Sequence, residues 1–423
     1  MSFCELPVPA FELASPGWRE VTLSALTPEH QSQPTADHEF NGFGGGFSYK
    51  SEEFSSRFVL WRVFKDVLEI SEFSLTESLT HNALRIRFSS PILRSVEMYE
   101  DVDEFYNPKV VIFALTASCT LYRFCFEHPS APAFSPSRCA SIFQGVDISA
   151  LQDSGISIAK PSLPVKLACC SARDASVVFS DGSIVCYGFS DTGAHQEIIL
   201  QEKTLMQRLW KGFIPGFSKN DACSVDDVCT ASVWAGWWLV FVVGVDNKLR
   251  IWNVDKRVCV KTIPLLEDDA VEEACIFKRH VRVCSNDADD KGDIRVVVYL
   301  DDKANAHFQL YRIGLEGSDL QIELECLSYT SFYGLADFTI MKNRIWAVWN
   351  GSESEGAKVS PNYNICYIEI PSLKQASAAT ELNTWIETFP QPCITLNDSR
   401  IDMSSFVPLG LFLSLTDMVS TIF

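Results

Sequence analysis

The sequence lacks the short motifs that mark the common catalytic sites. It contains no G-x-S-x-G nucleophile turn, no H-E-x-x-H zinc motif, no Walker loop and no G-x-G-x-x-G dinucleotide loop. Its seven histidines are scattered, and no two cysteines have the C-x-x-C spacing of a structural zinc site. We therefore expect no enzymatic activity, no cofactor, no metal and no small-molecule substrate.

Basic charge, long apolar runs and a secretory leader are also missing. The formal net charge is −19, and without a basic patch of useful length we expect no direct nucleic-acid binding. The N-terminus lacks a basic stretch followed by an apolar core, and the apolar residues 406–415 are too few to span a bilayer. The 15 cysteines are an odd number, and several lie inside apolar strands, which is typical of a reducing compartment. We expect a soluble intracellular protein.

Short β-strands are what the sequence does contain. Residues 237–263 predict three consecutive strands joined by polar turns, beginning with the apolar run 238–243. In the second strand we expect Leu249, Ile251 and Val254 to face one way. Short antiparallel strands with polar turns and a terminal Trp are typical of a propeller blade. Since a blade cannot bury its own faces, further copies are required.

Five other segments repeat this pattern of strand, polar turn and aromatic-rich strand. In chain order they are 58–71, 110–126, 177–187, 294–313 and 338–349. Their spacing of roughly 45 to 70 residues exceeds the about 40 to 45 of a regular WD-type repeat, which implies long loops between blades. We expect Trp252, Trp346 and Trp349 to be buried between sheets. A pair of β-sandwiches is the alternative fold.

The flanking regions differ in composition from the strand-rich part. Residues 1–50 predict a flexible N-terminal lead-in with a glycine loop at 42–46, and the propeller is expected over 51–390. After residue 390 the pattern changes: residues 398–423 predict a helix with Met418, Val419 and Ile422 on one face. We interpret 391–423 as the start of a truncated α-helical region.

A helical insertion is predicted at about 201–220, ended by Pro215 and Gly216. Its apolar residues form one stripe that either caps the flank of the propeller or docks a partner. The candidate docking residues are Leu205, Met206, Leu209, Trp210 and Phe213. On the opposite face, Lys203, Gln207 and Lys211 are expected to remain in solvent.

A second insertion, Ser130 to Ser157, combines bulky apolar residues with Ser, Ala and little charge. That composition suits contact with curved membrane through apolar insertion. The candidate membrane-contact residues are Phe134, Ile142, Phe143 and Val146. An ordered loop between blades is the alternative.

Four groups of residues resemble the family of the 160-kilodalton nucleoporin of the nuclear pore outer ring. They are Val67–Ile70 with Asn82–Phe88, Met206–Leu209 with Gly212 and Pro215, Asp246–Trp252, and Asp337–Phe338 with Ile345–Trp349. Their order and spacing agree with the family over roughly residues 55 to 390. Family members continue with a long helical region, whereas this chain ends where that region would start; it is interpreted as a fragment, a short isoform or a truncated gene model.

The resemblance implies an all-β, seven-bladed propeller followed by an α-helical domain. It implies a structural role in the Y-shaped scaffold complex of the nuclear pore, supporting pore assembly, nucleocytoplasmic transport and mRNA export. The implied location is the nuclear pore complex in the nuclear envelope, and the implied partners are other Y-complex nucleoporins and curved envelope membrane. The alternative is a WD-type propeller that acts as a peptide-binding adaptor in another nuclear complex.

Overall fold

The computed structural model is built almost entirely of β-strands, as the alternating apolar pattern predicts. The residues it describes are 18–23, 41–49, 57–74, 77–102, 107–131, 140–160, 162–190, 194–200, 224–233, 237–266, 278–284, 293–301, 306–316, 319–330, 334–341, 344–350, 363–370, 380–381, 386–389, 411–413 and 420–422. The chain divides into two compact units. Unit 1 is Met1–Ala159 with Phe412–Thr421, and unit 2 is Lys160–Leu411 with Ile422–Phe423.

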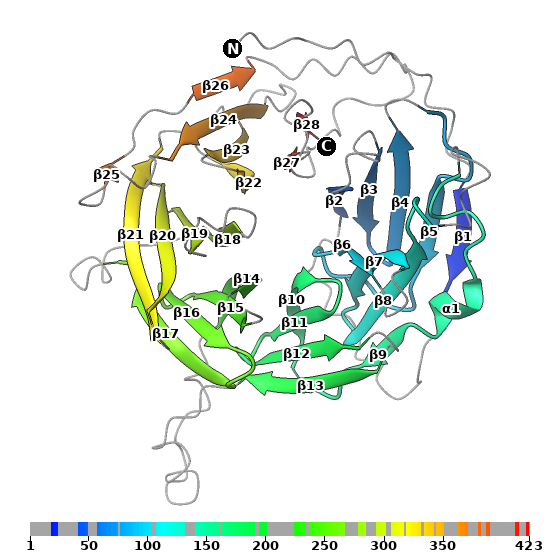
Figure 1. Cartoon of the computed structure of the whole chain (residues 1–423), viewed down its shortest axis with the longest axis horizontal. Helices are drawn as coiled ribbons and strands as arrows, with labels where there is room; N and C mark the ends of the chain where they lie inside the picture. The colour runs from blue at the N-terminus through cyan, green and yellow to red at the C-terminus, as the bar shows by residue number, and fades with distance from the viewer. Residues whose placement is uncertain are drawn as a thin grey trace, which may run out of the picture. The chain divides into compact units, whose positions relative to one another are not determined.

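Unit 1 contains two sheets (Figure 1). The first has the order β1-β5-β4-β3-β2 and consists of β1 (Trp18–Thr22), β2 (Asn41–Ser48), β3 (Arg57–Phe64), β4 (Val67–Ser74) and β5 (Ala83–Arg87). The second has the order β6-β7-β8-β9 and consists of β6 (Glu97–Val102), β7 (Pro108–Leu115), β8 (Thr120–Glu127) and β9 (Gly155–Ser157), with the helix α1 (Ile148–Gln152) before β9. Four consecutive strands of each sheet form an antiparallel meander, whereas β1 pairs with β5 in parallel.

Unit 2 contains four sheets of the same kind. Their strands are β10 (Pro164–Ser171), β11 (Asp174–Phe179), β12 (Ile184–Phe189) and β13 (His195–Leu200); β14 (Val225–Val233), β15 (Trp237–Gly244), β16 (Lys248–Asn253) and β17 (Val258–Pro264); β18 (Lys278–Cys284), β19 (Ile294–Asp301), β20 (His307–Glu316), β21 (Asp319–Tyr329) and β25 (Thr380–Glu381); and β22 (Leu335–Met341), β23 (Arg344–Asn350), β24 (Tyr363–Glu369) and β26 (Ile386–Phe389). The first strands of successive sheets contact one another, β10 with β14, β14 with β18 and β18 with β22.

These six meanders are the blades of a β-propeller, so the all-β propeller expected from the sequence is confirmed. The expected number of seven blades is wrong: the described residues form six. Five of the six sequence segments supply two adjacent strands of one blade, the segment 237–263 supplies three, and no described segment remains for a seventh blade. The one further sheet is a two-stranded pair, β27 (Leu411–Leu413) with β28 (Ser420–Ile422).

Both flanking regions contain strands that were not expected. The pair β27 and β28 lies where a helix was predicted over 398–423; the other residues after 389 lie outside the described part. At the N-terminal end, the predicted glycine loop is strand β2. Glycine is required there by close packing, because a Cβ on Gly45 would lie 2.6 Å from the Trp61 ring.

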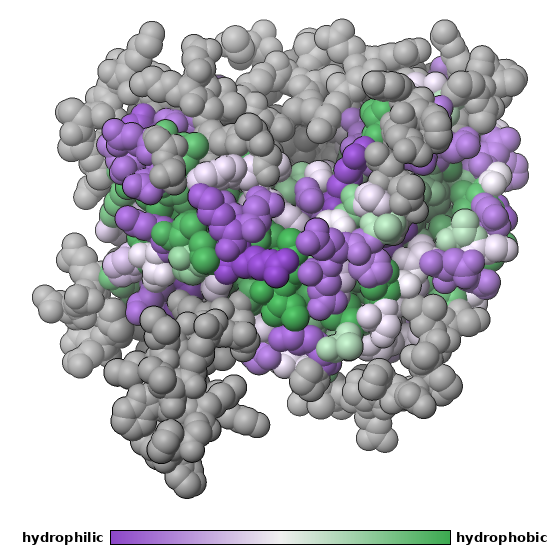
Figure 2. Space-filling model, turned by 60° about the horizontal axis from the view of Figure 1, so that its bottom comes forward, coloured by the Kyte–Doolittle hydropathy of each residue, from purple (hydrophilic) through white to green (hydrophobic). Residues whose placement is uncertain are grey.

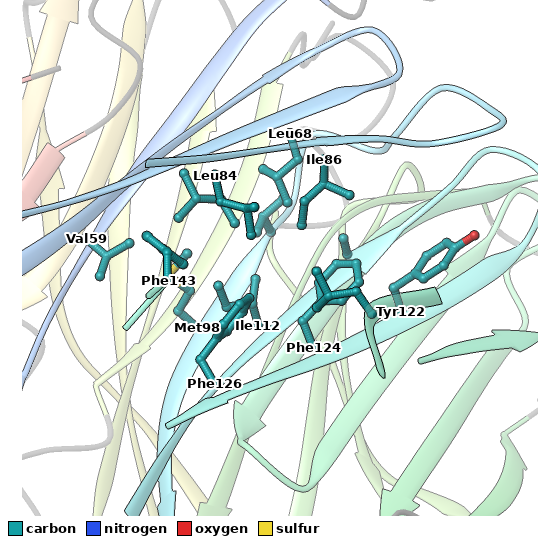
Figure 3. Packing of buried hydrophobic residues seen from close by; sticks show 14 of the residues in the cluster. Val59, Leu68, Leu84, Ile86, Met98, Ile112, Tyr122, Phe124, Phe126 and Phe143 are labelled. Carbon is teal, nitrogen blue, oxygen red and sulfur yellow. The ribbon is translucent and has the colours of Figure 1, made fainter. Parts of the chain in front are cut away.

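The core of unit 1 lies between its two sheets (Figure 3). Side chains from β3, β4 and β5 meet side chains from β6, β7 and β8, including Leu68, Ile86, Ile112 and Phe124, which are fully buried. Alternation along each strand gives one face to this core, and the aromatic rings fill the space between the sheets.

In unit 2 the core is repeated between each pair of neighbouring blades. Trp252, Trp346 and Trp349 are 5%, 8% and 1% exposed, which confirms their predicted burial. Leu249 and Ile251 pack toward the blade of β18–β21, but Val254 packs with Trp252 toward the blade of β10–β13. The prediction that Val254 shares a face with Leu249 was wrong because residues an odd number apart along a strand point to opposite faces.

Candidate functional site

The described residues hold no group of three or more His, Cys, Asp or Glu side chains that could bind a metal ion. No described helix is long and apolar enough to cross a membrane. Several of the buried polar side chains join strands and loops to each other, among them Asp227 and Glu72. The candidate functional features are therefore the surfaces that these contacts hold in place.

Four charged side chains on the first strands of successive blades contact one another in unit 2. Lys166 on β10 pairs with Asp227 on β14, and Arg282 on β18 lies 2.9 Å from Asp227 and 3.3 Å from Asp337 on β22. Each contact joins two neighbouring blades, and the sign of the charge alternates. We name these four residues the inner-strand ion row.

Asp227 is the centre of the ion row and is completely buried. Besides its two cations, it accepts hydrogen bonds from the backbone N–H of Val228 (2.8 Å) and of Val281 (2.9 Å). A buried carboxylate is tolerated only when its oxygens are satisfied in this way. Because both oxygens are occupied, the geometry suits cross-linking of blades and leaves no acceptor for a substrate.

Regular strand pairing is interrupted beside three of the four residues of the ion row. The strand register shifts between Pro164 and Lys166, between Val225 and Asp227, and between Leu335 and Asp337. A bulge of this kind re-aims one side chain out of the regular alternation. Phe338 donates its N–H to Asp337 at 2.9 Å as Val228 does to Asp227, so β14 and β22 use the same local device.

A histidine faces the same carboxylate. The Nδ1 atom of His280 lies 3.4 Å from an Asp227 oxygen. Burial, with the neighbouring cations Arg282 and Lys166, lowers the pKa of His280 to about 3. The imidazole is therefore neutral at neutral pH, and it adds no third cation to the row.

Arg279 joins the next blade to the turn between β15 and β16. Its Nε donates to the Asn247 side-chain oxygen at 2.8 Å, another guanidinium N–H donates to the Val245 carbonyl at 3.1 Å, and it pairs with Asp226. Asn247 adopts a φ of 56°, a conformation that Asn tolerates better than most residues. The turn belongs to the Asp246–Trp252 segment singled out in the sequence, so its residues are explained by contacts within the fold.

In unit 1 a buried glutamate holds the loop at 140–146. Glu72 is completely buried and accepts hydrogen bonds from the Ile142 backbone N–H (2.9 Å) and the Tyr49 hydroxyl (2.8 Å). Arg57 lies 3.7 Å from Glu72 and donates to the Ala140 carbonyl at 3.1 Å. Burial raises the pKa values of Glu72 and Tyr49.

This anchoring places two of the candidate membrane-contact residues in the core. Ile142 and Phe143 are each 2% exposed, and the Phe143 ring packs edge-on against Phe126 with 5.3 Å between centroids (Figure 3). Val146 is partly buried against the same cluster, and Phe134 lies outside the described residues. The structure thus corrects the assignment of Ile142 and Phe143: their apolar surface is already used by the fold.

The candidate docking residues of the predicted helical insertion, Leu205, Met206, Leu209, Trp210 and Phe213, lie outside the described residues. Sequence reasoning missed a different feature, the outer edges of the blades. The outer strands β13 and β17 expose apolar side chains, with Ile199 at 51% and Val258 at 46%. Hydrophobic surface appears between hydrophilic side chains on the face shown in Figure 2. The available signal was alternation in strands of mixed polarity, which is weak.

Comparison with known proteins gives a family for most of the chain. The family model described as the β-propeller domain of nucleoporin Nup120/160 matches residues 57–400. Nuclear pore complex protein Nup160 of Mus musculus is 24% identical over 347 residues, covering 75% of this chain and 24% of that protein. The Homo sapiens protein is 23% identical over 350 residues (75% and 24% covered), and the Drosophila melanogaster homologue is 24% identical over 360 residues (80% and 24%). The chain thus spans about a quarter of the length of these curated relatives.

Proposed function

The chain belongs to the nucleoporin Nup120/160 β-propeller family, and from this premise we propose that it is a structural scaffold component of the outer ring of the nuclear pore complex. In that role it assembles with other Y-complex nucleoporins at the nuclear envelope. The proposal extends to support of pore assembly, nucleocytoplasmic transport and mRNA export. The single observation behind it is the family match, which begins in β3 and extends past β26.

The side-chain chemistry of the described residues supports a scaffold. Two of their fully buried carboxylates connect parts of the fold: Asp227 joins neighbouring blades in the ion row, and Glu72 joins a blade to a loop. A scaffold protein needs binding surfaces with one fixed conformation. Networks of satisfied buried polar groups provide this because each alternative arrangement leaves a group unpaired.

The predicted helical insertion at 201–220 is the proposed docking element for a neighbouring nucleoporin. Its stripe of Leu205, Leu209 and Phe213 has the spacing of one helical face, and an amphipathic helix presented to a groove is a recurrent mode of recognition. The opposite face, which includes Lys211, provides a matched control position.

The test is expression of the tagged chain in cells, with imaging and affinity purification from nuclear extract. We expect a nuclear-rim signal and co-purification of Y-complex nucleoporins. Leu209→Glu should reduce their recovery, while Lys211→Glu should leave it unchanged. Diffuse nuclear staining without any nucleoporin in the eluate would refute the scaffold assignment.

The same purification separates the scaffold from the alternative of a peptide-binding adaptor. An adaptor would recover subunits of one other nuclear complex, and a competing peptide would release them. If instead nucleoporins are recovered equally with Leu209→Glu and the parent chain, the scaffold assignment stands and the helix is not its docking element.

A further inference from the structure

The outer edge of the first blade is covered by a fifth strand that runs parallel to it. Strand β1 pairs with β5 over five residues, from Trp18 opposite Ala83 to Thr22 opposite Arg87. The blade of β18–β21 also has a parallel fifth strand, because β25 pairs with β21 at Cys326 and Leu327. Two of the six described blades therefore accept a parallel extended segment at their outer edge.

The chemistry of the β1–β5 pair shows what such an edge recognises. Glu20 on β1 lies 3.9 Å from a guanidinium nitrogen of Arg85 and 3.4 Å from one of Arg87, both on β5. The next residue, Val21, is 2% exposed. The added strand thus contributes a carboxylate (Glu20) that pairs with two cations of β5, and an apolar side chain (Val21) that enters the core. Backbone pairing with β5 fixes its register.

Strand β17 offers a comparable edge without a fifth strand. It is the last strand of its sheet, and no described strand pairs with its outer side. Val258 is 46% exposed, and Val260 and Ile263 are only partly buried. An exposed edge with unpaired N–H and C=O groups and apolar side chains is a template for another strand.

Positive charge distinguishes this edge in a chain whose net charge is −19. Residues 256–261 include Lys256, Arg257 and Lys261. Lys256 lies over the Trp237 ring at 4.0 Å, and no described carboxylate forms a salt bridge with Arg257 or Lys261. Asp255, the acid that precedes Lys256 in the chain, accepts the Trp238 N–H at 3.2 Å.

The other uncovered outer strands fit less well. Strand β9 has only three residues. Strand β13 exposes Ile199, but its polar residues are His195, Gln196 and Glu197, and Glu197 accepts a hydrogen bond from Tyr187 at 3.1 Å. Only β17 combines an open edge, exposed apolar surface and unpaired cations among the outer strands whose side chains are described.

We propose that β17 binds an extended acidic segment of a partner protein, which adds a parallel fifth strand to this blade. The Arg257 and Lys261 side chains pair with its carboxylates, and its alternate apolar residues cover Val258. This binding mode does not depend on the assignment to the nuclear pore, because it follows from the edge alone.

The test uses the purified 423-residue chain and two fluorescein-labelled peptides of alternating valine with either glutamate or lysine. Fluorescence anisotropy should show saturable binding of the glutamate peptide and none of the lysine peptide. Lys261→Glu should weaken binding about tenfold, since it replaces an attractive pair with a repulsive one. Arg19→Glu, which reverses the charge in the same way at an exposed position on β1, is the control and should have no effect.

Hydrogen exchange locates the peptide independently. Protection of amides in Val258–Pro264, with none gained in Ala83–Arg87, is the expected result, because β1 already covers β5. Absence of binding by the glutamate peptide, equal binding by the parent chain and Lys261→Glu, or protection confined to another strand would each overturn the proposal. If Lys261→Glu lowers the melting temperature, Lys261→Gln, which removes the charge without reversing it, must still weaken binding.

Discussion

Replacing Asp227 by the uncharged Asn should destabilise unit 2 more than the same kind of isosteric replacement at any other charged residue on the first strands. In Asp227→Asn, Lys166 and Arg282 lose their common partner, and the new amide NH₂ faces a backbone N–H that donates to the present carboxylate. Losing one partner of a fully buried ion pair costs about 3 to 5 kcal/mol. Lys166 and Arg282 retain 27% and 32% of their side-chain exposure, so water recovers part of this, and we expect about 3 kcal/mol.

The adjacent residue provides the control. Asp226 is 28% exposed at its side chain and has one cationic partner, Arg279, so Asp226→Asn should cost about 1 kcal/mol. Urea unfolding of both variants and the parent, followed by tryptophan fluorescence and circular dichroism, measures the difference. Since the chain has two compact units, the shift should appear in the transition of unit 2 and spare that of unit 1. Equal midpoints for Asp227→Asn and Asp226→Asn would refute the central role of the ion row.

Three further outcomes are expected. Trp252→Ala should lower the free energy of unfolding by about 3 to 5 kcal/mol by opening a cavity between blades, and an unchanged melting curve would contradict its placement. Gly45→Ala should destabilise unit 1 by about 1 to 3 kcal/mol because its Cβ would meet Trp61, whereas Gly188→Ala, with nothing within 4 Å, should be nearly neutral in the same melt. His280 binds a proton in the unfolded chain below about pH 6.5, but in the folded chain only near pH 3, so the free energy of unfolding falls as the pH is lowered through that window. His280→Gln should remove about 1 kcal/mol of the loss between pH 7 and pH 5, because partial exposure of the imidazole reduces the full effect. Urea titration of both proteins at each pH measures the difference.

The sequence predicted two adjacent strands in five of the blades, three in the blade of β14–β17, and little beyond them. Strands such as β15, nearly all apolar, and β16, which alternates and carries Trp252 as its last aromatic residue, give a strong signal. First strands such as β14, with the charged Asp227 as its third residue, give no such signal, because their buried positions include charges. Strand β2 was predicted as a loop because glycine ordinarily opposes strand formation, and only the Trp61 ring on the neighbouring strand explains it.

The candidate surfaces were harder to predict because they depend on partners distant in sequence. Nothing near Ile142 indicates that its N–H is bonded to Glu72, 70 residues earlier, yet this contact decides that the loop is core. The same holds for the edge of β17: its lysine and valines are visible in the sequence, but whether a fifth strand covers them depends on chain segments elsewhere in the fold.

The ion row gives a measure of blade spacing in unit 2 that depends on the residues of this chain and not on a resemblance. Successive members of the row are 61, 55 and 55 residues apart, which is the spacing of blades in unit 2. Each step joins one first strand to the next, so the row marks one charged position per blade with alternating sign. Three of the four charges lie beside a shift in strand register, and each charge pairs with one on the neighbouring first strand. The row therefore marks the four blades of unit 2 from contacts within this chain, whereas the expected number of seven came from the resemblance alone.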